Sequence, residues 1–353
     1  MYLELATPEL TALDHRVQKN CHISDAQFAG NYTLCIYLLK MRELYRWETQ
    51  QPFSTTLGND EVGDWLKDRE ALWRELEDHR FLSLEIDGQQ LDPFESDEIN
   101  RHLQRYDLVY SGGVGRGAQP HFFLGELVRK VEHGDYSVLI SGREFARDLG
   151  SPPAMSQGRT IYLRRESLRR MLWEKIEEWR WNRPLNAMSR TLAEYDFSTT
   201  NVERTLERLT DVELESMLDH EIGEIMAQDQ LGEAWETLLA TLPHSKAEIM
   251  LRAIRDHLAD ALSTLPALLQ RQQTASIHFY FANLNSMRKH LYPGLMAAYE
   301  AWCQGEGFAI LRKQMLAGKA HWQALCEEIM FFASESENPD IKSIEQRIED
   351  SRL

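Results

Sequence analysis

The spacing of hydrophobic and polar residues divides the chain into two parts with different secondary structure. Up to about residue 160, stretches with helical spacing alternate with short apolar runs that are separated by glycine-containing turns. From Glu166 onward, apolar residues recur at helical spacing with few interruptions. The sequence therefore predicts an α+β fold, with a mixed N-terminal domain containing antiparallel hairpins over residues 1–164 and a mainly helical bundle over residues 165–353.

A helix is expected to begin near Ser24, because Ser24 and Gln27 have the spacing of a capping box. The apolar residues that follow lie on one helical face, and Glu43 lies on that same face. A carboxylate at a core-facing position must be paired, neutralised or bound to a ligand. Two interpretations stay open for Glu43: a buried ion pair with Arg42 or Arg46, and a carboxylate that lines a pocket.

The rest of the N-terminal domain is expected to contain two hairpins and a glycine-rich loop. Asp87-Gly88 separates two short apolar runs and predicts a type I′ turn. The loop runs from Ser111 to Gly117. The predicted elements are a helix over 61–78, hairpin strands over 81–86 and 89–91, a strand over 107–110, hairpin strands over 122–131 and 136–140, and a strand over 160–163.

The second half is expected to consist of helices whose boundaries lie at or near prolines, where helices commonly end or begin. The predicted helices cover 166–182, 201–209, 211–230, 244–262, 274–290, 292–303, 318–332 and 340–351.

Charge bears on the class of partner. The chain has 353 residues with 39 Lys and Arg against 56 Asp and Glu, a net charge of −17. Nucleic-acid binding needs clustered basic residues, so no nucleic-acid partner is expected. Acidic residues are concentrated between residues 194 and 236, and basic residues between 159 and 183. These two segments either steer ligands of opposite sign or are solvated helix faces.

The hydropathy, the N-terminal pattern and the cysteines of the chain indicate a cytoplasmic protein. No apolar run approaches the roughly 18 residues that a membrane helix needs, and the N-terminus lacks the pattern of a signal peptide. The four cysteines form no Cys-x-x-Cys pair, which argues against a disulfide framework and a zinc ribbon. Adjacent Cys21 and His22 suggest a thiolate–imidazole pair, with a buried structural thiol as the alternative.

The sharpest local motif is His220-Glu221-Ile222-Gly223-Glu224, where His220 and Glu224 share one face of a predicted helix. The string resembles the His-Glu-x-x-His motif of zinc metalloproteases, in which the glutamate is the general base. The resemblance assigns that role to Glu221. It departs from the motif at the second ligand, which is Glu224 here. The alternative is a solvated helix face.

Glu213 precedes His220 by seven residues, a spacing that resembles the first ligand pair of haem-oxygenase-like di-iron proteins. That family's His-x3-Asp-x2-His triplet is absent, and His257 is among the nearest candidates on a later helix. Helix bundles hold metals with inward-facing carboxylates and histidines. The predicted ligands are therefore Glu213, His220, Glu224 and His257, around a divalent iron, manganese or zinc ion.

The glycine-rich loop suggests an anion site, because consecutive backbone N–H groups can surround an anion. The sequence lacks both the dinucleotide-binding fingerprint and the P-loop lysine. Arg116 and His121 are candidate anion ligands, and Arg164 and Arg165 near a helix N-terminus are two more. Arg169 and Arg170 would add positive potential. A flexible turn beside a solvated helix is the alternative.

Two functional hypotheses follow. The first is a metal-dependent enzyme with its ion in the helical half, for oxidation or hydrolysis. The second is a non-catalytic binding or regulatory protein that uses its acidic helical surface or its Gly/Arg-rich region. The partner would be a small molecule or a protein, and the methionine and tryptophan content allows a homodimer.

Overall fold

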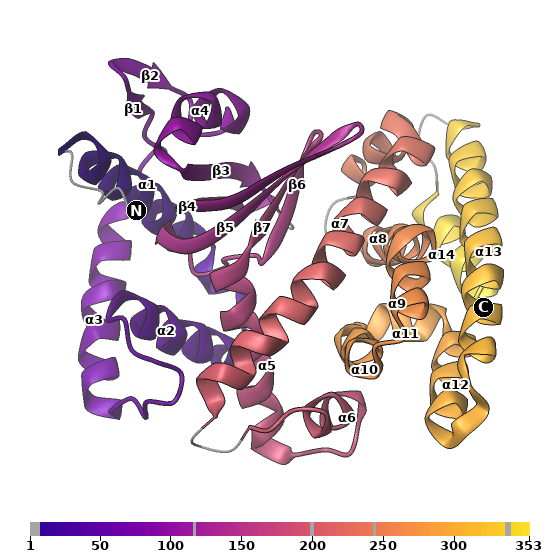
Figure 1. The fold of residues 1–353 in the computed structure, drawn as a ribbon. Coiled ribbons are helices and arrows are strands. Elements are labelled where there is room, and N and C mark those ends of the chain that lie inside the picture. The colour runs from indigo at the N-terminus through magenta and orange to yellow at the C-terminus, as the bar shows by residue number, and fades with distance from the viewer. Residues whose placement is uncertain (1–7, 116–117, 198–200, 243–244, 336–339) are drawn as a thin grey trace. The chain divides into compact units, whose positions relative to one another are not determined.

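The computed structural model describes residues 8–115, 118–197, 201–242, 245–335 and 340–353 (Figure 1). They form two compact units: Met1–Trp181 with Phe197–Leu214, and Asn182–Asp196 with Glu215–Leu353. The first combines helices with a mixed sheet and the second is helical, which confirms the predicted α+β class.

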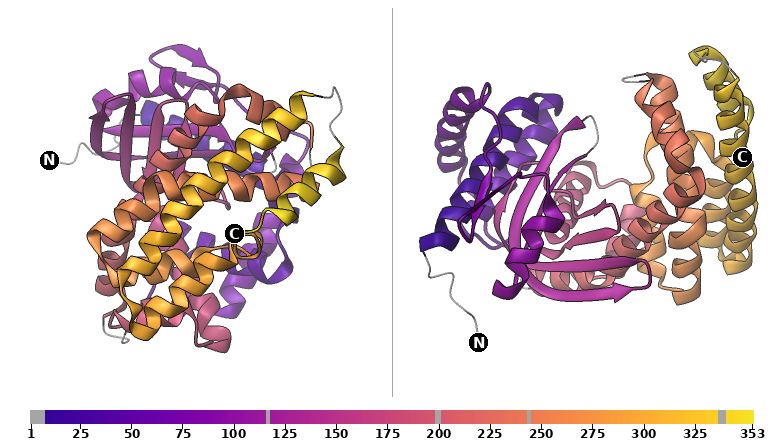
Figure 2. Two further views of the ribbon diagram at one scale, coloured as in Figure 1. Left: turned by 90° about the vertical axis from the view of Figure 1, so that its right-hand side faces the viewer. Right: turned by 90° about the horizontal axis from the view of Figure 1, so that it is seen from above.

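A curled five-stranded sheet is the centre of the first unit (Figures 1 and 2). Its neighbours are antiparallel except β5 and β7, which are parallel. Three register shifts between β4 and β5 interrupt the ladder there, and bulges of this kind bend a sheet. In spatial order the strands are β3 (Leu108–Val114), β4 (Pro120–His133), β5 (Tyr136–Arg147), β7 (Thr160–Arg164) and β6 (Ala154–Gln157).

Alternation along the strands gives the sheet two apolar faces. Tyr110 and Phe122 belong to one buried cluster, together with Val17 of the first helix. Val109 and Phe123 belong to another cluster. The helices of this unit are α1 (Pro8–Phe28), α2 (Leu34–Glu48), α3 (Asn59–Leu76), α4 (Ser96–Leu103), α5 (Arg165–Asn182) and the start of α7 (Val202–Ala240).

The short hairpin of β1 (Leu84–Ile86) and β2 (Gln89–Leu91) confirms the predicted turn. Asp87 and Gly88 have φ of 54° and 75°, and positive φ at both central residues defines type I′. Helix α3 and strand β7 also match their predicted positions closely.

The predicted start of the first helix was wrong. Ser24 lies inside α1, is buried, and donates a hydrogen bond from Oγ to the Pro120 carbonyl oxygen at 2.5 Å. The next helix, α2, begins only at Leu34, after Thr33 in extended conformation. The Ser24 hydroxyl therefore joins α1 to the sheet, a long-range contact that local spacing does not reveal.

The predicted glycine loop was wrong in part, because β3 continues through Ser111-Gly112-Gly113 to Val114. A Cβ on Gly112 would collide with the Pro93 carbonyl oxygen. The glycine there permits close backbone packing, which is a structural reason for its presence. Arg116 and Gly117 lie outside the described residues.

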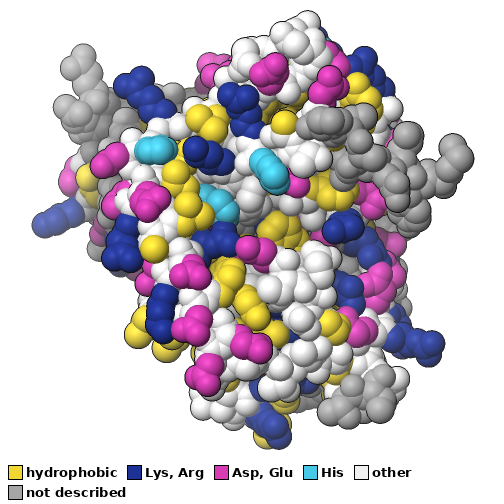
Figure 3. All heavy atoms as spheres, turned by 90° about the vertical axis from the view of Figure 1, so that its left-hand side faces the viewer, with side chains coloured by type: hydrophobic (Ala, Val, Ile, Leu, Met, Phe, Trp, Pro, Cys, Tyr) yellow, Lys and Arg dark blue, Asp and Glu magenta, His cyan; other side chains and the backbone are white. Residues whose placement is uncertain are grey.

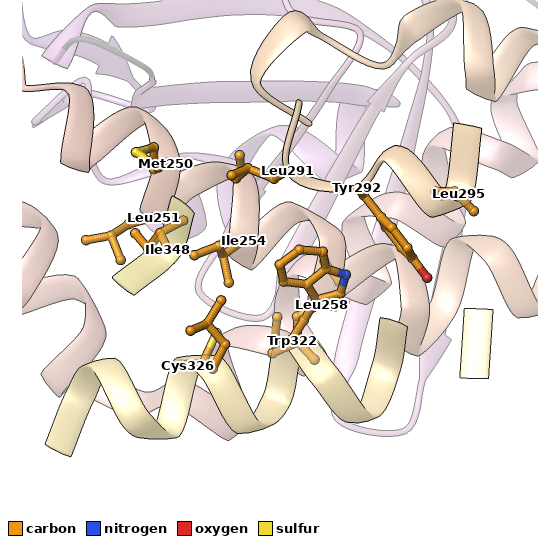
Figure 4. Packing of buried hydrophobic residues seen from close by; sticks show 14 of the residues in the cluster. Met250, Leu251, Ile254, Leu258, Leu291, Tyr292, Leu295, Trp322, Cys326 and Ile348 are labelled. Atoms are coloured by element: carbon orange, nitrogen blue, oxygen red, sulfur yellow. The ribbon is translucent and has the colours of Figure 1, made fainter. Parts of the chain in front are cut away.

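The second unit packs its helices around one core, shown in Figure 4. Ile254 and Leu258 of α8 meet Trp322 and Cys326 of α13, and Ile348 of α14 joins them. The helices after α7 are α8 (Lys246–Ala259), α9 (Leu265–Arg271), α10 (Thr274–Asn283), α11 (Ser286–Leu291), α12 (Pro293–Ala301), α13 (Phe308–Ser334) and α14 (Ile341–Asp350), and α6 (Ala187–Ala193) precedes it.

Three predictions in this region were wrong. The helices expected over 201–209 and 211–230 are one helix, α7, whose non-helical break comes later, at Gly232 with φ of 66°. The helix expected over 274–290 is two, α10 and α11, and the helix expected over 318–332 begins already at Phe308. Gly223 of α7 sits where a Cβ would collide with the Ala259 carbonyl oxygen of α8. The glycine in the His-Glu-x-Gly-Glu string thus lets two helices approach closely.

Candidate functional site

A cavity of about 270 Å³ in the first unit gathers more charged side chains than its size would lead one to expect. One wall is α2 and the segment after it, residues 43–53. Arg147 at the end of β5 and the first two turns of α5 form the opposite wall, and Glu203 of α7 completes the lining. Four of the lining residues are arginines: Arg46, Arg147, Arg169 and Arg170. We call this cavity the arginine pocket.

Arg46 and Glu43 are fixed on α2, three residues apart. Arg46 Nε donates to Glu43 Oε2 at 2.9 Å, and both side chains are buried. Arg46 Nη1 also donates to the carbonyl oxygens of Pro52 and Thr55, at 2.6 and 3.0 Å. Both interpretations of Glu43 therefore apply, because it is ion-paired with Arg46 and also lines the pocket. Arg42 instead pairs with Glu177 at 3.5 Å.

Arg147, the last residue of β5, contributes the second guanidinium group of the pocket. Its Nη2 donates to the Glu43 carbonyl oxygen at 3.2 Å, and its Nη1 lies 3.7 Å from Glu144 Oε2. The guanidinium lies over the Trp47 ring, 4.6 Å from the centroid, in a cation–π contact. Burial, assisted by the charge of Arg170, lowers the pKa of Arg147 to about 10. It remains charged at neutral pH.

Two successive residues of α5 complete the set of cations. Arg170 is buried and donates from Nη2 to the carbonyl oxygens of Gly150 and Ser151, at 3.0 and 2.9 Å. Arg169 donates from Nη2 to Glu203 Oε2 at 2.5 Å and lies over the Phe53 ring at 5.3 Å. Arg46 also contacts Phe53, at 5.7 Å. Aromatic rings thus hold three of the four guanidinium groups in place.

Several polar atoms of the pocket are buried without a hydrogen-bond partner among the described residues. The donors are Arg46 Nη2, Arg147 Nε, Arg170 Nε and Trp47 Nε1, and the acceptor is Glu43 Oε1. Leaving such a group unsatisfied costs about 1–3 kcal/mol, so a native protein rarely accumulates several at one place without a reason. A ligand with acceptor oxygens would satisfy the donors.

Two carboxyl groups of the pocket, those of Glu43 and Glu166, have raised pKa values, which favours their neutral form. Burial raises the pKa of Glu43, and the opposing charge of Arg46 does not cancel this effect. Burial and the nearby charge of Glu144 raise the pKa of Glu166. A raised pKa makes the neutral form of Glu43 and Glu166 easier to reach, and a neutral acid leaves more of the arginine charge available for an anion.

The three predicted anion ligands that the structure describes do not line this pocket. Arg164 is fully buried, where its Nε donates to Glu144 Oε1 at 2.8 Å. Arg165 is ion-paired with Glu207 and Asp211 at 2.6 and 2.5 Å. His121 Nδ1 lies 3.2 Å from Asp148 Oδ1. Arg116 is outside the described residues, and the anion roles of all four stay predictions.

The predicted metal ligands are distributed over the second half. His220 Nδ1 lies 3.2 Å from Asp260 Oδ1, and His220 Nε2 lies 3.8 Å from Glu224 Oε1. Glu224 also pairs with Arg255 at 2.7 Å. His257 contacts the Arg288 carbonyl oxygen at 3.0 Å and stacks on Trp322. No group of three or more His, Cys, Asp or Glu side chains within the described ranges is arranged to hold a metal ion.

Asp260 is the centre of the polar contacts there, which we call the Asp260 network. This buried carboxylate accepts from Tyr280 Oη at 2.7 Å and Thr264 Oγ1 at 3.1 Å, and it pairs with Arg288 and His220. Although burial lowers the pKa of His220, the hydrogen bond and charge of Asp260 outweigh it and raise that pKa to about 9. The predicted ligand Glu213 and the predicted general base Glu221 are also buried on α7.

The thiolate–imidazole pair at Cys21 and His22 has no support in the geometry. Cys21 is buried, and burial together with nearby Asp148 raises the pKa of its thiol well above the usual value. Burial and the charge of Arg69 lower the pKa of His22 to about 3. Cys21 Sγ donates to the Phe122 carbonyl oxygen at 3.3 Å, as expected of a structural thiol.

Sequence reasoning identified residues of the pocket on both α2 and α5 and missed others. Glu43 was singled out by its place on an apolar face, and Arg169 and Arg170 by the local density of basic residues. Arg147 and Phe53 carried no signal, because their importance depends on which distant residues they meet. On the face of the molecule shown in Figure 3, basic and acidic side chains are interspersed.

Comparison with protein families matches nearly the whole chain. Residues 12–164 match the N-terminal domain, and residues 169–351 the C-terminal domain, of a family of unknown function, DUF6866. The chain belongs to this family. No curated protein and no solved structure gives a match. As for membranes, the described helices include none that is long and apolar enough to cross one.

Proposed function

We propose that this member of the DUF6866 family binds a small oxyanion in the arginine pocket, as a binding or regulatory protein rather than a metal enzyme. The observation that carries the proposal is that four residues lining one cavity, Arg46, Trp47, Arg147 and Arg170, each have a buried donor atom without a hydrogen-bond partner among the described residues. Guanidinium groups match the geometry of carboxylate, sulfate and phosphate oxygens.

The size of the pocket limits the ligand. A volume of about 270 Å³ is below the usual range of drug-sized sites, which begins at roughly 300 Å³. The ligand, or the part of it that enters, is therefore a small acid with few carbon atoms or a single phosphoryl or sulfuryl group.

The metal-dependent enzyme is the weaker hypothesis. Its central pair, His220 and Glu224, lies beside cations that already balance the carboxylates: Arg255 on Glu224 and Arg288 on Asp260. A metal ion would compete with these guanidinium groups. In the arginine pocket, unpartnered donors outnumber unpartnered acceptors among the described residues.

Two arginines of α5 provide a matched test. Arg169 lines the pocket and Arg165, one turn earlier, does not. Both pair with acidic residues of α7, including Glu207, and are about equally exposed, at 26% and 28%. We therefore propose to measure sulfate and acetate binding by calorimetry, at constant ionic strength, in the wild type, Arg169→Met and Arg165→Met.

The expected result is binding by the wild type that weakens at least tenfold in Arg169→Met and less than threefold in Arg165→Met. A tenfold change corresponds to about 1.4 kcal/mol, within the range of a charge-assisted hydrogen bond. Equal weakening in both variants would show that binding follows overall charge and would contradict the proposal. So would a wild type that binds neither anion.

A further inference from the structure

Glu43, like Glu166 and Glu203, lines the arginine pocket although a carboxylate conflicts with an anion site. Its Oε1 is buried and has no hydrogen-bond partner among the described residues, whereas Oε2 accepts from Arg46. A charged carboxylate oxygen would repel the oxygen atoms of a bound oxyanion. A protonated carboxyl group would instead donate a hydrogen bond to the ligand.

We propose that Glu43 takes up a proton from solvent when the arginine pocket binds a small oxyanion, and donates it through Oε1 in a hydrogen bond to a ligand oxygen. The inference rests on the proposed function and specifies it. The ligand class becomes acids whose bound form keeps an acceptor oxygen, carboxylates or phosphoryl and sulfuryl groups. Oε2 maintains the pair with Arg46, which leaves Oε1 as the oxygen that can serve a ligand.

The surroundings of Glu43 favour such a protonation. Burial already raises its pKa before any ligand is present. A bound anion adds a further negative charge and would raise that pKa again. The charged groups around it are Arg42 and Arg46 on its own helix, Arg147 on β5, and Glu166, Arg169, Arg170 and Glu174 on α5, with Glu203 on α7 at the far side of the pocket.

Glu166 is the other acid of the pocket with a raised pKa, but its geometry differs. One of its oxygens, Oε2, accepts from the backbone N–H of Glu144 at 2.5 Å. A hydrogen bond from a backbone N–H stabilises the charged form of a carboxylate. Glu166 is thus the matched control: an acid in the same pocket, with an oxygen already engaged.

Proton uptake is measured by titrating sulfate or acetate into the protein near pH 7, in two buffers that differ in heat of ionisation. Neither anion changes its own protonation near this pH, so the difference in observed heat reports protons taken up by the protein. We expect roughly one proton per anion bound in the wild type, with affinity rising as pH falls, by up to about tenfold per pH unit.

The variants assign the proton. Glu43→Gln keeps a donor and an acceptor on the same frame, so we expect it to bind within about threefold of the wild-type affinity and without proton uptake. Glu43→Ala removes the donor and should weaken binding at least tenfold. Glu166→Gln should retain the uptake. Circular dichroism melting curves establish that each variant is folded.

The outcomes separate the two proposals. Binding of sulfate or acetate with no proton uptake would overturn the role of Glu43 and leave the oxyanion site standing. Uptake that persists in Glu43→Gln and disappears in Glu166→Gln would assign the proton to Glu166 and also overturn it. Absence of any binding would overturn the proposed function itself. Preference for sulfate or for acetate would distinguish a phosphoryl-like ligand from a carboxylate.

Discussion

The arginine pocket and the Asp260 network both bury charge, but they leave it in different states. In the network, one carboxylate is enclosed by Arg288, Tyr280, Thr264 and His220, so its acceptor capacity is used within the protein. In the pocket, unpartnered donor atoms outnumber unpartnered acceptors among the described residues, and these donors belong to residues that line a cavity. A closed cluster holds helices together, whereas an open one has capacity for a ligand.

The largest effect is expected from removing the central carboxylate of the Asp260 network. Asp260→Ala would leave the Arg288 guanidinium buried without its partner, and losing one partner of a buried pair costs about 3–5 kcal/mol. We expect the free energy of unfolding of the second unit to fall by this amount in urea denaturation followed by circular dichroism.

An exposed pair in the same unit provides the control for Asp260. Glu328 pairs with Arg347 on the surface, with the two side chains 53% and 41% exposed. Glu328→Ala should change the unfolding free energy by less than about 1 kcal/mol, since surface ion pairs contribute little. If Asp260→Ala were equally mild, the Asp260 network would not be closed and the comparison would fail.

The next effect concerns the arginine pocket. We expect it to be larger on the affinity for sulfate than on the free energy of unfolding. Arg147→Met keeps an unbranched apolar side chain at this position but removes the guanidinium and its contact with the Trp47 ring. We expect sulfate affinity to fall at least tenfold, about 1.4 kcal/mol. Stability should fall by only about 1–3 kcal/mol, because Glu144 keeps Arg164 as its partner. Stability loss with unchanged affinity would show that the pocket is structural after all.

The same contrast explains what the sequence could and could not predict. Glu43, His220 and Glu224 were all placed on the correct helical faces, because side-chain direction follows from local periodicity. Whether each face meets a cavity or a cation depends on distant segments. Arg255 and Arg288 lie on other helices and pair with Glu224 and Asp260. Arg147 lies on a strand about 100 residues from Glu43 in sequence and contacts its carbonyl oxygen.

The fold was predictable to a similar extent and for the same reason. The Asp87-Gly88 turn is fixed by two residues and was predicted correctly. Gly112 was taken for part of a loop because its role, the close approach of β3 to the Pro93 carbonyl, involves chain 19 residues earlier. Ser24 likewise resembled a helix cap because its partner, Pro120, is distant.

A third prediction concerns how the stability of the Asp260 network depends on pH. The pKa of His220 is about 9 in the folded protein, above its ordinary value of 6.5. Its contribution to stability is therefore fully present below pH 6.5 and is lost as pH rises through 9. Because 28% of the side chain is exposed, we expect a loss of only about 1–2 kcal/mol between these limits.

His220→Gln isolates this contribution from other titrating groups. The difference in unfolding free energy between wild type and variant, measured by urea denaturation from pH 6 to pH 10, should shrink as pH rises. A difference that is constant over this range would mean that His220 is not held as a cation by Asp260, and the Asp260 network would lose one of its partners.

The smallest effect tests whether the Phe53 ring positions the guanidinium groups of the arginine pocket. Phe53 has Arg46 and Arg169 over its ring, and a partly exposed cation–π contact contributes about 0.5–1 kcal/mol. Phe53→Leu should therefore weaken sulfate binding about two- to fivefold by letting the guanidinium groups move. The control is Phe81→Leu, which alters a ring packed against Phe94 and Phe122 instead.

A double-mutant cycle of Phe53→Leu with Arg169→Met decides whether the ring acts through the arginine. If it does, Phe53→Leu should have almost no further effect once Arg169 is gone, apart from its contact with Arg46. Strict additivity would mean that Phe53 contacts the anion directly or only fills space. The pocket would then be organised by its ion pairs alone, and the aromatic contacts would no longer distinguish it from the Asp260 network.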